Sequence, residues 1–259
     1  MGRTTPTVAS LVHAELMRQS TSPIQRPGLP ASRERDSSEV IIDLRGPVAL
    51  RIEADERRIE NPTYRHRARG YDNATAAFNA FRARAVDLLE LTAGQVVLDV
   101  GCGTGLCFSM VQERIGPTGW VIGIDRSAEM LALADVRCLG QGWRNVTLIE
   151  SDAESADIRR SADAALFCAA HDILQSSGAV RNVLRHVRPG GRCVAVGAKW
   201  APPWFFGLNV LTALAHRPYV NSFVGFDKPW RVLTQFVPEL QVTEIAFGAG
   251  YAAVGQVRG

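Results

Sequence analysis

The sequence predicts an α/β fold built on a doubly wound, mostly parallel sheet. Three observations support this prediction: short β-branched runs alternate with helical patterns between residues 96 and 199, a glycine-rich loop follows the first run, and two strand-like runs close the chain. Strands separated by helices of this length form parallel sheets, because each helix carries the chain back across the sheet. The two closing runs predict a hairpin, which adds an antiparallel pair.

The elements follow from the hydrophobic periodicity in chain order. Strands are predicted in the parallel part at residues 96–100, 120–125, 146–152, 162–170 and 192–199. Helices precede or connect them at residues 73–94, 106–115, 127–139 and 177–187. Ser127 is the expected N-cap of the third helix, with Glu129 in its first turn. The closing strands are predicted at residues 240–248 and 251–257, separated by Ala249 and Gly250.

The composition excludes several classes of protein. At 259 residues, the chain has room for one domain with an appendage. The formal net charge is +3 with both signs spread along the chain, so no basic block indicates nucleic-acid binding. Five cysteines, without the spacing of zinc ligands, indicate free thiols and a cytoplasmic location. No apolar run reaches the roughly 18 residues that would predict a membrane span.

The chain divides into an arm, a domain and an insertion. Residues 1–62 are predicted to form an N-terminal arm, since their Ser-, Pro- and Arg-rich part can bury little apolar surface. Residues 63–259 are predicted to form the α/β domain, interrupted by an insertion at residues 200–234. Its aromatic residues suit the walls of a site for a flat or lipidic ligand. A helical hairpin packed on the sheet, or a dimer contact, would explain them as well.

Gly101, Gly103 and Gly105 occupy alternate positions in the loop after the first strand. A turn between a strand and a helix N-terminus presents unpaired backbone amides, and side chains there would hold a ligand away. By itself, this run also fits a dinucleotide fingerprint or a closely packed turn. The residues around the loop decide between these interpretations.

Three successive strands are predicted to finish in an aspartate at one edge of the sheet. Asp99 lies two residues before the first glycine, where its carboxylate can accept hydrogen bonds from the loop amides. Asp125 ends the next strand, where an acid can bind two adjacent ribose hydroxyls. Asp152 ends the third. Packing alone does not explain three acids at one buried edge, which would favour apolar residues.

The stretches "VVLDVGCGTG", "VIGIDRSAEML", "VTLIESDAES" and "VLRHVRPGGRCVAVG" resemble, in this order, the motifs of class I S-adenosylmethionine-dependent methyltransferases. The resemblance extends from about Tyr71 to the end of the chain. It implies a seven-stranded Rossmann-like methyltransferase sheet with an antiparallel C-terminal strand hairpin. It also implies S-adenosyl-L-methionine as cofactor and S-adenosyl-L-homocysteine as product. This cofactor has no phosphate, and the loop has no P-loop lysine.

The resemblance implies a set of cofactor contacts. The loop glycines would contact the methionine end and the ribose, and Asp125 would bind the ribose hydroxyls. Asp152 and Ala153 would contact the adenine edge, and Met130 would cover an adenine face unless it is a core residue. Tyr71 resembles a tyrosine of quinone C-methyltransferase-like members that precedes the first helix and would cover the cofactor. The expected cofactor-binding residues are Tyr71, Asp99, Gly101, Cys102, Gly103, Gly105, Asp125, Arg126, Met130, Asp152 and Ala153.

In this family the end of the fourth strand faces the methyl group, and here it reads "LFCAAHDIL". His171 and Asp172 are therefore the candidate catalytic residues. A histidine of near-neutral pKa can act as general base on an acceptor hydroxyl or acidic carbon. A histidine that only caps the following segment is the alternative. The chain lacks the Asn/Asp-Pro-Pro-Tyr/Phe motif of base-methylating enzymes and a carboxylate cluster for a metal.

The predicted function is methyl transfer from S-adenosylmethionine to a small, apolar or aromatic acceptor by direct in-line displacement. The expected partner is a small-molecule substrate, without nucleic acid, and a homodimer remains open. The alternatives are a protein or peptide methyltransferase, and a non-catalytic partner subunit that binds the cofactor. The acceptor atom is not predicted, because O-, N-, S- and C-methylation share one scaffold.

Overall fold

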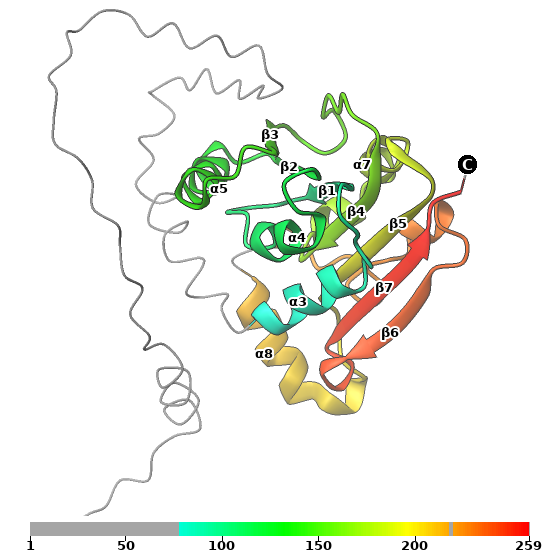
Figure 1. The fold of residues 1–259 in the computed structure, drawn as a ribbon. Helices are drawn as coiled ribbons and strands as arrows, with labels where there is room; N and C mark the ends of the chain where they lie inside the picture. Colours follow the sequence, from blue (N-terminus) through cyan, green and yellow to red (C-terminus); the bar gives the residue numbers. More distant parts are fainter. Residues whose placement is uncertain (1–77, 218–219, 259) are drawn as a thin grey trace, which may run out of the picture. The chain divides into compact units, whose positions relative to one another are not determined.

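The fold was derived from a computed structural model, which describes residues 78–217 and 220–258. In this part of the chain one sheet of seven strands has the order β3-β2-β1-β4-β5-β7-β6 (Figure 1). The predicted seven-stranded, doubly wound fold is confirmed. The predicted arm at residues 1–62 and Tyr71 lie outside the described residues, so those interpretations stay predictions.

The parallel part of the sheet comprises five strands, and β1 pairs with both β2 and β4. Their bounds are β1 (Val96–Val100), β2 (Trp120–Asp125), β3 (Val146–Glu150), β4 (Ala162–Cys168) and β5 (Val187–Ala198). Chain order runs outward from β1 in both directions, which makes the boundary of β1 and β4 the topological switch point. Ligands of doubly wound sheets bind outside the carboxyl ends of the strands at such a point.

The last two strands, β6 (Gln241–Ile245) and β7 (Gly250–Gln256), form the predicted hairpin. Strand β7 lies between β5 and β6 and is antiparallel to both. The turn lies earlier than predicted, at Ala246–Gly248, and Gly250 already pairs with Ala198 of β5. Ala246 and Phe247 take positive φ values of 50° and 55° to make this turn, a conformation that glycine would adopt with less strain.

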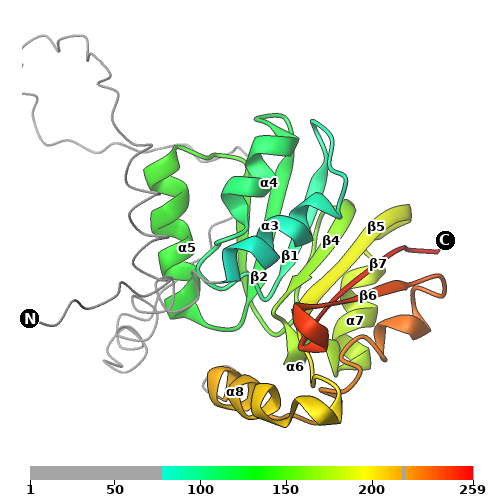
Figure 2. The ribbon, with the colours of Figure 1, turned by 90° about the horizontal axis from the view of Figure 1, so that it is seen from below.

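Helices cover both faces of the sheet, as Figure 2 shows. One face carries α3 (Asn79–Asp87), α4 (Phe108–Ile115) and α5 (Ala128–Gln141), and the other carries α6 (His171–Leu174) and α7 (Ser177–Leu184). Strand residues alternate between the two apolar cores: Val97 packs with the first group, and Leu98 with the second. This period of two is the expected pattern of a strand buried on both faces.

The helix ends follow local sequence signals. The Ser127 side chain accepts a hydrogen bond from the Met130 amide at 3.2 Å, so the predicted N-cap of α5 is confirmed. The helix predicted at residues 73–94 ends at Asp87, well before Gly94, and Glu90 has a φ of 51°. All five cysteines are free thiols, as expected, and four of them are buried.

The described residues between β5 and β6 are irregular apart from α8 (Phe206–His216) and the short helices at Pro203–Phe205 and Leu233–Gln235. This segment contains the predicted insertion at residues 200–234. Because it directly follows the carboxyl end of β5, this segment starts at the same sheet edge as the glycine loop. Within residues 78–217 and 220–258, no helix is both long and apolar enough to cross a membrane.

Candidate active site

The glycine loop connects β1 to α4. Gly101, Gly103 and Gly105 all have positive φ values, of 74°, 54° and 74°. The amides of Gly101 and Cys102 donate to the carbonyl of Ile124, at 2.8 and 3.1 Å, which ties the loop to the end of β2. Three left-handed residues within five positions would strain any other residue type, so the loop requires glycine here.

The three glycines differ in what surrounds them. A Cβ on Gly101 would lie 3.0 Å from Ile173 of α6, and one on Gly105 would lie 2.7 Å from the Phe108 ring. A Cβ on Gly103 would have no heavy atom within 4 Å. Gly101 and Gly105 thus allow close packing within the protein, whereas Gly103 presents bare backbone to open space. An incoming ligand can approach the backbone at Gly103.

Asp125 shapes this loop. Its Oδ2 accepts a hydrogen bond from the Gly103 amide at 2.9 Å, and its Oδ1 accepts one from the Ser127 amide at 2.9 Å. Burial raises the pKa of Asp125, and the two amides partly oppose this by stabilising the charge. Each carboxylate oxygen has a second lone pair, so both can still accept a hydroxyl hydrogen bond from a ligand.

Asp99 was expected to accept hydrogen bonds from the loop amides. The structure gives the amides of Gly101, Cys102 and Gly103 other acceptors, so that expectation is wrong. Asp99 lies within β1, is 2% exposed, and its Oδ2 is buried without a hydrogen-bond partner in the described part of the chain. Burial raises its pKa to about 7, the charge of Asp125 adds to this, and Arg82 opposes it.

A cavity of about 30 Å³ lies beside the loop, and Asp99 contributes to its wall. Its size admits about one water molecule, so a larger ligand must extend over the open side of the loop. The cavity brings together residues of α3, β1, the glycine loop and the end of β4. They are Arg82, Asp99, Gly101, Cys102, Thr104, Leu106, Cys107, Cys168 and Ala169.

The sequence reasoning missed six of these residues, and two of them, Arg82 and Ala169, lie outside both the glycine loop and the strands. Arg82 is 6% exposed, and Ala85, Val86 and Leu89 are also buried at helical spacing from it. An arginine on the buried stripe of a predicted helix is the signal that could have revealed it. Ala169 has a φ of 56°, which turns the chain from β4 into α6. Nothing in the local sequence indicates that turn.

The residues expected to contact adenine lie near Asp125, after the end of β3 and at the start of α5. Asp152 comes two residues after the end of β3 and is exposed, while Ala153 is buried. The Ser151 amide donates to the Asp125 carbonyl at 3.0 Å, which holds this segment next to the end of β2. Met130 is half-buried in the first turn of α5, and Arg126 is exposed. The structure therefore brings the predicted adenine residues to the same edge as the glycine loop.

His171 and Asp172 begin α6 and both face residues of the insertion. His171 Nε2 lies 3.2 Å from the Val224 carbonyl, and because a carbonyl only accepts, Nε2 is the protonated nitrogen. Burial lowers the pKa of His171, against the Asp172 charge, which raises it. Its Nδ1 is buried without a hydrogen-bond partner within residues 78–217 and 220–258. Asp172 Oδ2 accepts hydrogen bonds from the Asn221 amide and side chain, at 3.1 and 2.6 Å.

Half-buried aromatic side chains of the insertion surround Phe226, which is 1% exposed. Its ring centroid lies 4.9 Å from those of His171 and Trp200, and 5.1 Å from that of Phe223. These rings pack on one another beside the start of α6. The candidate base is thus part of this aromatic cluster and does not line the small cavity beside the loop.

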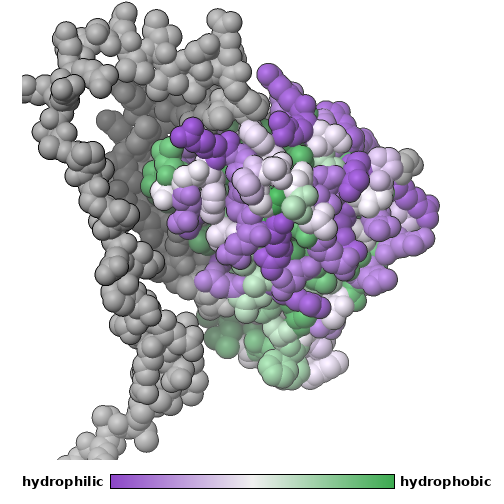
Figure 3. All heavy atoms as spheres, in the orientation of Figure 1, coloured by the Kyte–Doolittle hydropathy of each residue, from purple (hydrophilic) through white to green (hydrophobic). Residues whose placement is uncertain are grey.

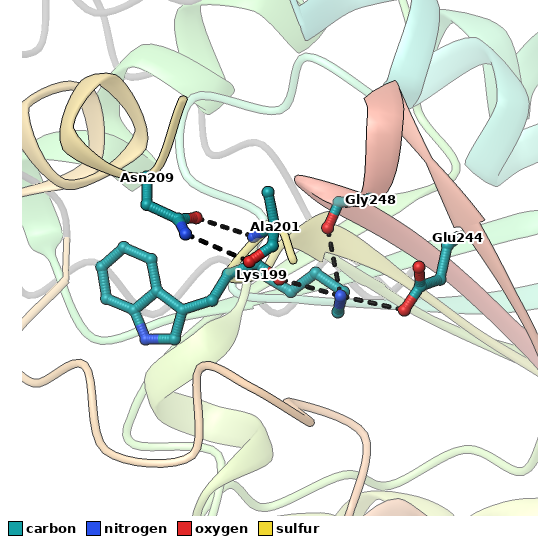
Figure 4. A network of polar contacts seen from close by, with 6 residues as sticks. Lys199, Ala201, Asn209, Glu244 and Gly248 are labelled. Carbon is teal, nitrogen blue, oxygen red and sulfur yellow. Dashed lines mark hydrogen bonds and ion pairs between the residues drawn. The ribbon is translucent and has the colours of Figure 1, made fainter. Parts of the chain in front are cut away.

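Lys199 joins the insertion to the closing hairpin, as Figure 4 shows. Its side chain is 8% exposed, and Nζ donates to the carbonyls of Trp200 and Gly248, at 2.8 and 3.0 Å. Nζ also pairs with Glu244 Oε1 at 2.9 Å. The Asn209 side chain of α8 exchanges two hydrogen bonds with the backbone of Ala201, at 2.8 and 3.1 Å. These contacts attach α8 to the end of β5.

We expect Lys199→Met to lower the free energy of unfolding by about 2 kcal/mol, because the buried Gly248 carbonyl and the half-buried Trp200 carbonyl lose their donor. Glu244→Gln is the matched control. Glu244 is 55% exposed, so its charge should contribute less than about 1 kcal/mol. Urea denaturation of both variants measures the difference. Equal losses in the two variants would assign the effect to the ion pair instead of the carbonyl contacts.

A larger hollow of about 740 Å³ lies elsewhere, at the amino ends of β2 and β3, with Trp120 and Trp143 in its wall. Its buried amides, Gln112 and Asn145, already bond each other at 3.0 Å in both directions. Ligands of doubly wound sheets bind at the carboxyl ends of the strands, so the smaller cavity beside the glycine loop marks the candidate site.

An acid-flanked glycine loop at the switch point of a doubly wound sheet is typical of proteins that bind a nucleoside-containing ligand. Residues 97–191 match the family model described as a methyltransferase domain. The chain therefore carries a methyltransferase domain of the class I S-adenosylmethionine-dependent type.

Curated relatives and solved structures agree with this assignment. Aklanonic acid methyltransferase DauC of Streptomyces sp. (strain C5) is 38% identical over 78 residues, which cover 30% of this chain and 36% of the relative. The ubiquinone/menaquinone biosynthesis C-methyltransferase UbiE of Pseudomonas fluorescens is 29% identical over 143 residues, 54% of each chain. The chain thus spans about a third to a half of the curated relatives it matches.

The crystal structure of a SAM-dependent methyltransferase from Aquifex aeolicus has a similar fold. Its TM-score is 0.54 at 17% sequence identity, and the match covers 74% of this chain and 98% of that one. At this identity, the likeness concerns the fold.

Proposed function

We propose that this protein transfers a methyl group from S-adenosylmethionine to a small, apolar or aromatic acceptor by direct in-line displacement. One observation carries the proposal: Gly103 presents bare backbone beside Asp125, which accepts its amide, at the switch point of a methyltransferase domain. The names of two relatives, which refer to aklanonic acid and to ubiquinone and menaquinone biosynthesis, support a small-molecule acceptor.

The residues present fit this cofactor. The unbonded, buried Oδ2 of Asp99 offers an acceptor to an ammonium group, which the methionine end of the cofactor carries. Arg82 lies in the same cavity wall and would hold the methionine carboxylate. Asp125 would accept hydrogen bonds from the ribose hydroxyls while it keeps the loop in place. Asp152, Ala153 and Met130 would enclose the adenine.

The sulfonium of the bound cofactor supplies a reactive methyl group. The chain has to align the acceptor with that group and exclude water. The insertion, with its aromatic cluster at the end of β4 and β5, supports an apolar acceptor. His171 stays a candidate general base through Nδ1, since Nε2 is bonded to Val224. Asp172 holds Asn221 and thereby positions the insertion.

Calorimetry with S-adenosylmethionine and S-adenosylhomocysteine tests the cofactor assignment, and micromolar binding of both is expected. Incubation with labelled S-adenosylmethionine and fractionated metabolite extracts then tests transfer, and label is expected in a small organic product. Absence of binding would refute the cofactor assignment. Binding with label transferred only to protein would refute the small-molecule acceptor.

Asp125→Ala should weaken cofactor binding about tenfold or more, because a charged hydrogen-bond pair is lost. The loop contact to Gly103 is lost in the same variant, so a second ligand separates the two effects. An analogue without the ribose 2′ hydroxyl should bind the unchanged protein more weakly than the normal ligand does. The variant should bind the two ligands almost equally. If it still discriminated between them as strongly, Asp125 would not be the ribose ligand.

A further inference from the structure

Helix α8 is amphipathic, but its polar side faces the protein and its apolar side faces outward. Polar residues at positions 209, 212 and 216 face the protein: Asn209 bonds Ala201, Thr212 is 7% exposed, and the His216 ring contacts Phe226 and Phe78. Apolar residues on the other side face outward, with Phe206 74%, Leu211 64% and Leu214 64% exposed. A surface helix of a globular protein normally buries its apolar stripe. Within residues 78–217 and 220–258, the apolar side of α8 therefore lacks the contact that such a stripe requires.

Further exposed apolar residues extend this side of the helix. Trp204, just before α8, is 79% exposed, and Phe247, at the tip of the β6–β7 turn, is 84% exposed. The two segments are neighbours, since a Cβ on Gly248 would lie 2.8 Å from Pro202. We call the set Trp204, Phe206, Val210, Leu211, Leu214 and Phe247 the α8 surface. Figure 3 shows hydrophobic residues gathered over α8, at the bottom of the view.

Helix α8 carries no charged residue, and an excess of basic residues follows it in the sequence. Residues 200–216 contain no Asp, Glu, Lys or Arg. The charged residues of the insertion that follow are Arg217, Asp227, Lys228 and Arg231, all exposed, with a net charge of +2. An uncharged, aromatic-rich helix that ends directly before the basic residue Arg217 matches the surface of a bilayer that contains anionic lipids.

We infer that the α8 surface docks on a lipid bilayer, with α8 lying in the plane of the interface and Arg217 contacting anionic headgroups. The helix has 11 residues, about half the number needed to cross the hydrocarbon, so it would lie on the bilayer without spanning it. Trp and Phe side chains at its start and at the hairpin tip would enter the boundary between headgroups and acyl chains.

A lipid suits this surface better than a protein partner does. Protein interfaces pair apolar contacts with about one hydrogen bond per 100–200 Å². The Asn209 side chain already uses both its groups on Ala201, and the His216 Nδ1 contacts the Thr212 carbonyl at 2.9 Å. The polar side chains of α8 thus face inward, and the Trp204 indole N–H is the one side-chain hydrogen-bonding group of the α8 surface. Acyl chains require none.

This inference goes beyond methyl transfer and does not depend on it. Because α8 follows the carboxyl end of β5, docking would bring the sheet edge with the glycine loop toward the bilayer. A site near that surface would have access to lipid-dissolved molecules.

Flotation of the full chain with vesicles tests the inference. Phosphatidylcholine vesicles, with and without phosphatidylglycerol, are compared by the fraction of protein that floats. Binding is expected in both, and it should be stronger with phosphatidylglycerol. The double variant Leu211→Gln/Leu214→Gln should lower the partition coefficient about tenfold or more, since two apolar side chains are lost from the interface. Arg217→Gln should weaken binding only to the anionic vesicles.

Leu139→Gln is the matched control, because Leu139 of α5 is 72% exposed and lies outside the α8 surface. This control should bind vesicles as the unchanged chain does. Absence of vesicle binding, or equal losses in the control and the double variant, would overturn the inference. The inference would also be overturned if the double variant changed its oligomeric state, or if it lost more folding stability than the control. Those results would assign the surface to a second copy or to another segment of this chain. Cofactor calorimetry on the same variants reports separately on the proposed function.

Discussion

Gly103→Val is expected to weaken binding of S-adenosylmethionine by about 100-fold or more, which corresponds to about 2.7 kcal/mol. Gly103 has a φ of 54°, and no heavy atom lies within 4 Å of the place a Cβ would take. The new side chain would therefore meet no protein atom and would occupy the space in which the ligand approaches the loop. Isothermal titration calorimetry measures the change.

A matched control separates the loss of binding from backbone strain. Gly142, at the C-terminus of α5, has a φ of 70° and equally open surroundings. Both Gly103→Val and Gly142→Val should cost about 1–2 kcal/mol of folding stability, because a valine is forced into a left-handed conformation. Only the first should affect cofactor binding. Similar affinities in the two variants would mean that the ligand does not approach Gly103.

Asp99 is expected to make the protein less stable as the pH rises from about 4 to 7. Burial raises its pKa to about 7 from an ordinary 3.8, so across this range the folded state holds a proton that the unfolded state has released. The stability that protonated Asp99 contributes is fully present below the pKa that Asp99 has in the unfolded chain. It is lost as the pH rises through the pKa that Asp99 has in the folded protein. The difference between these two pKa values corresponds to a loss of at most about 4 kcal/mol in the free energy of unfolding.

The variant Asp99→Asn should remove this loss, because a neutral amide carries no charge to bury. Its free energy of unfolding should exceed that of the unchanged protein by about 2–4 kcal/mol at pH 8, and the two should agree near pH 4. Urea denaturation at several pH values measures both. Asp157→Asn is the control, since that side chain is 71% exposed. A pH dependence that persisted in Asp99→Asn would contradict the assignment.

The same charge should assist cofactor binding. An ammonium group placed beside Asp99 Oδ2 would favour the ionised carboxylate, so the affinity for S-adenosylmethionine should rise with pH through about 7. Asp99→Asn should therefore combine higher stability with weaker binding. Such a trade-off is common where a buried charge serves a ligand and destabilises the fold without it.

The sequence predicted most of the fold from local patterns. The strands at Val96–Val100 and Trp120–Asp125 agree with prediction, because apolar runs between turn signals have few alternative structures. The N-cap at Ser127 was equally predictable from its hydroxyl and position. The hairpin turn was misplaced, since Ala246 and Phe247 adopt left-handed conformations that their side chains do not favour.

The candidate site was predictable where the loop itself carries it. The three glycines and Asp125 come from adjacent strand ends, so strand order in a parallel sheet brings them together. Arg82 comes from α3 and Ala169 from the end of β4, and both reach the cavity only through packing. Their place depends on contacts between distant segments, which no local pattern records.

The sequence alone determined the class of fold and the glycine loop, because both follow from periodicity and from the backbone freedom of glycine. Only the tertiary structure decided which acid shapes the loop: Asp125 accepts the Gly103 amide, whereas Asp99 is left buried with an unbonded oxygen. The structure also decided that α8 presents its apolar side outward, since the direction a helix faces depends on what packs against it. A sequence shows that a helix has two sides, and tertiary contacts determine which one is buried.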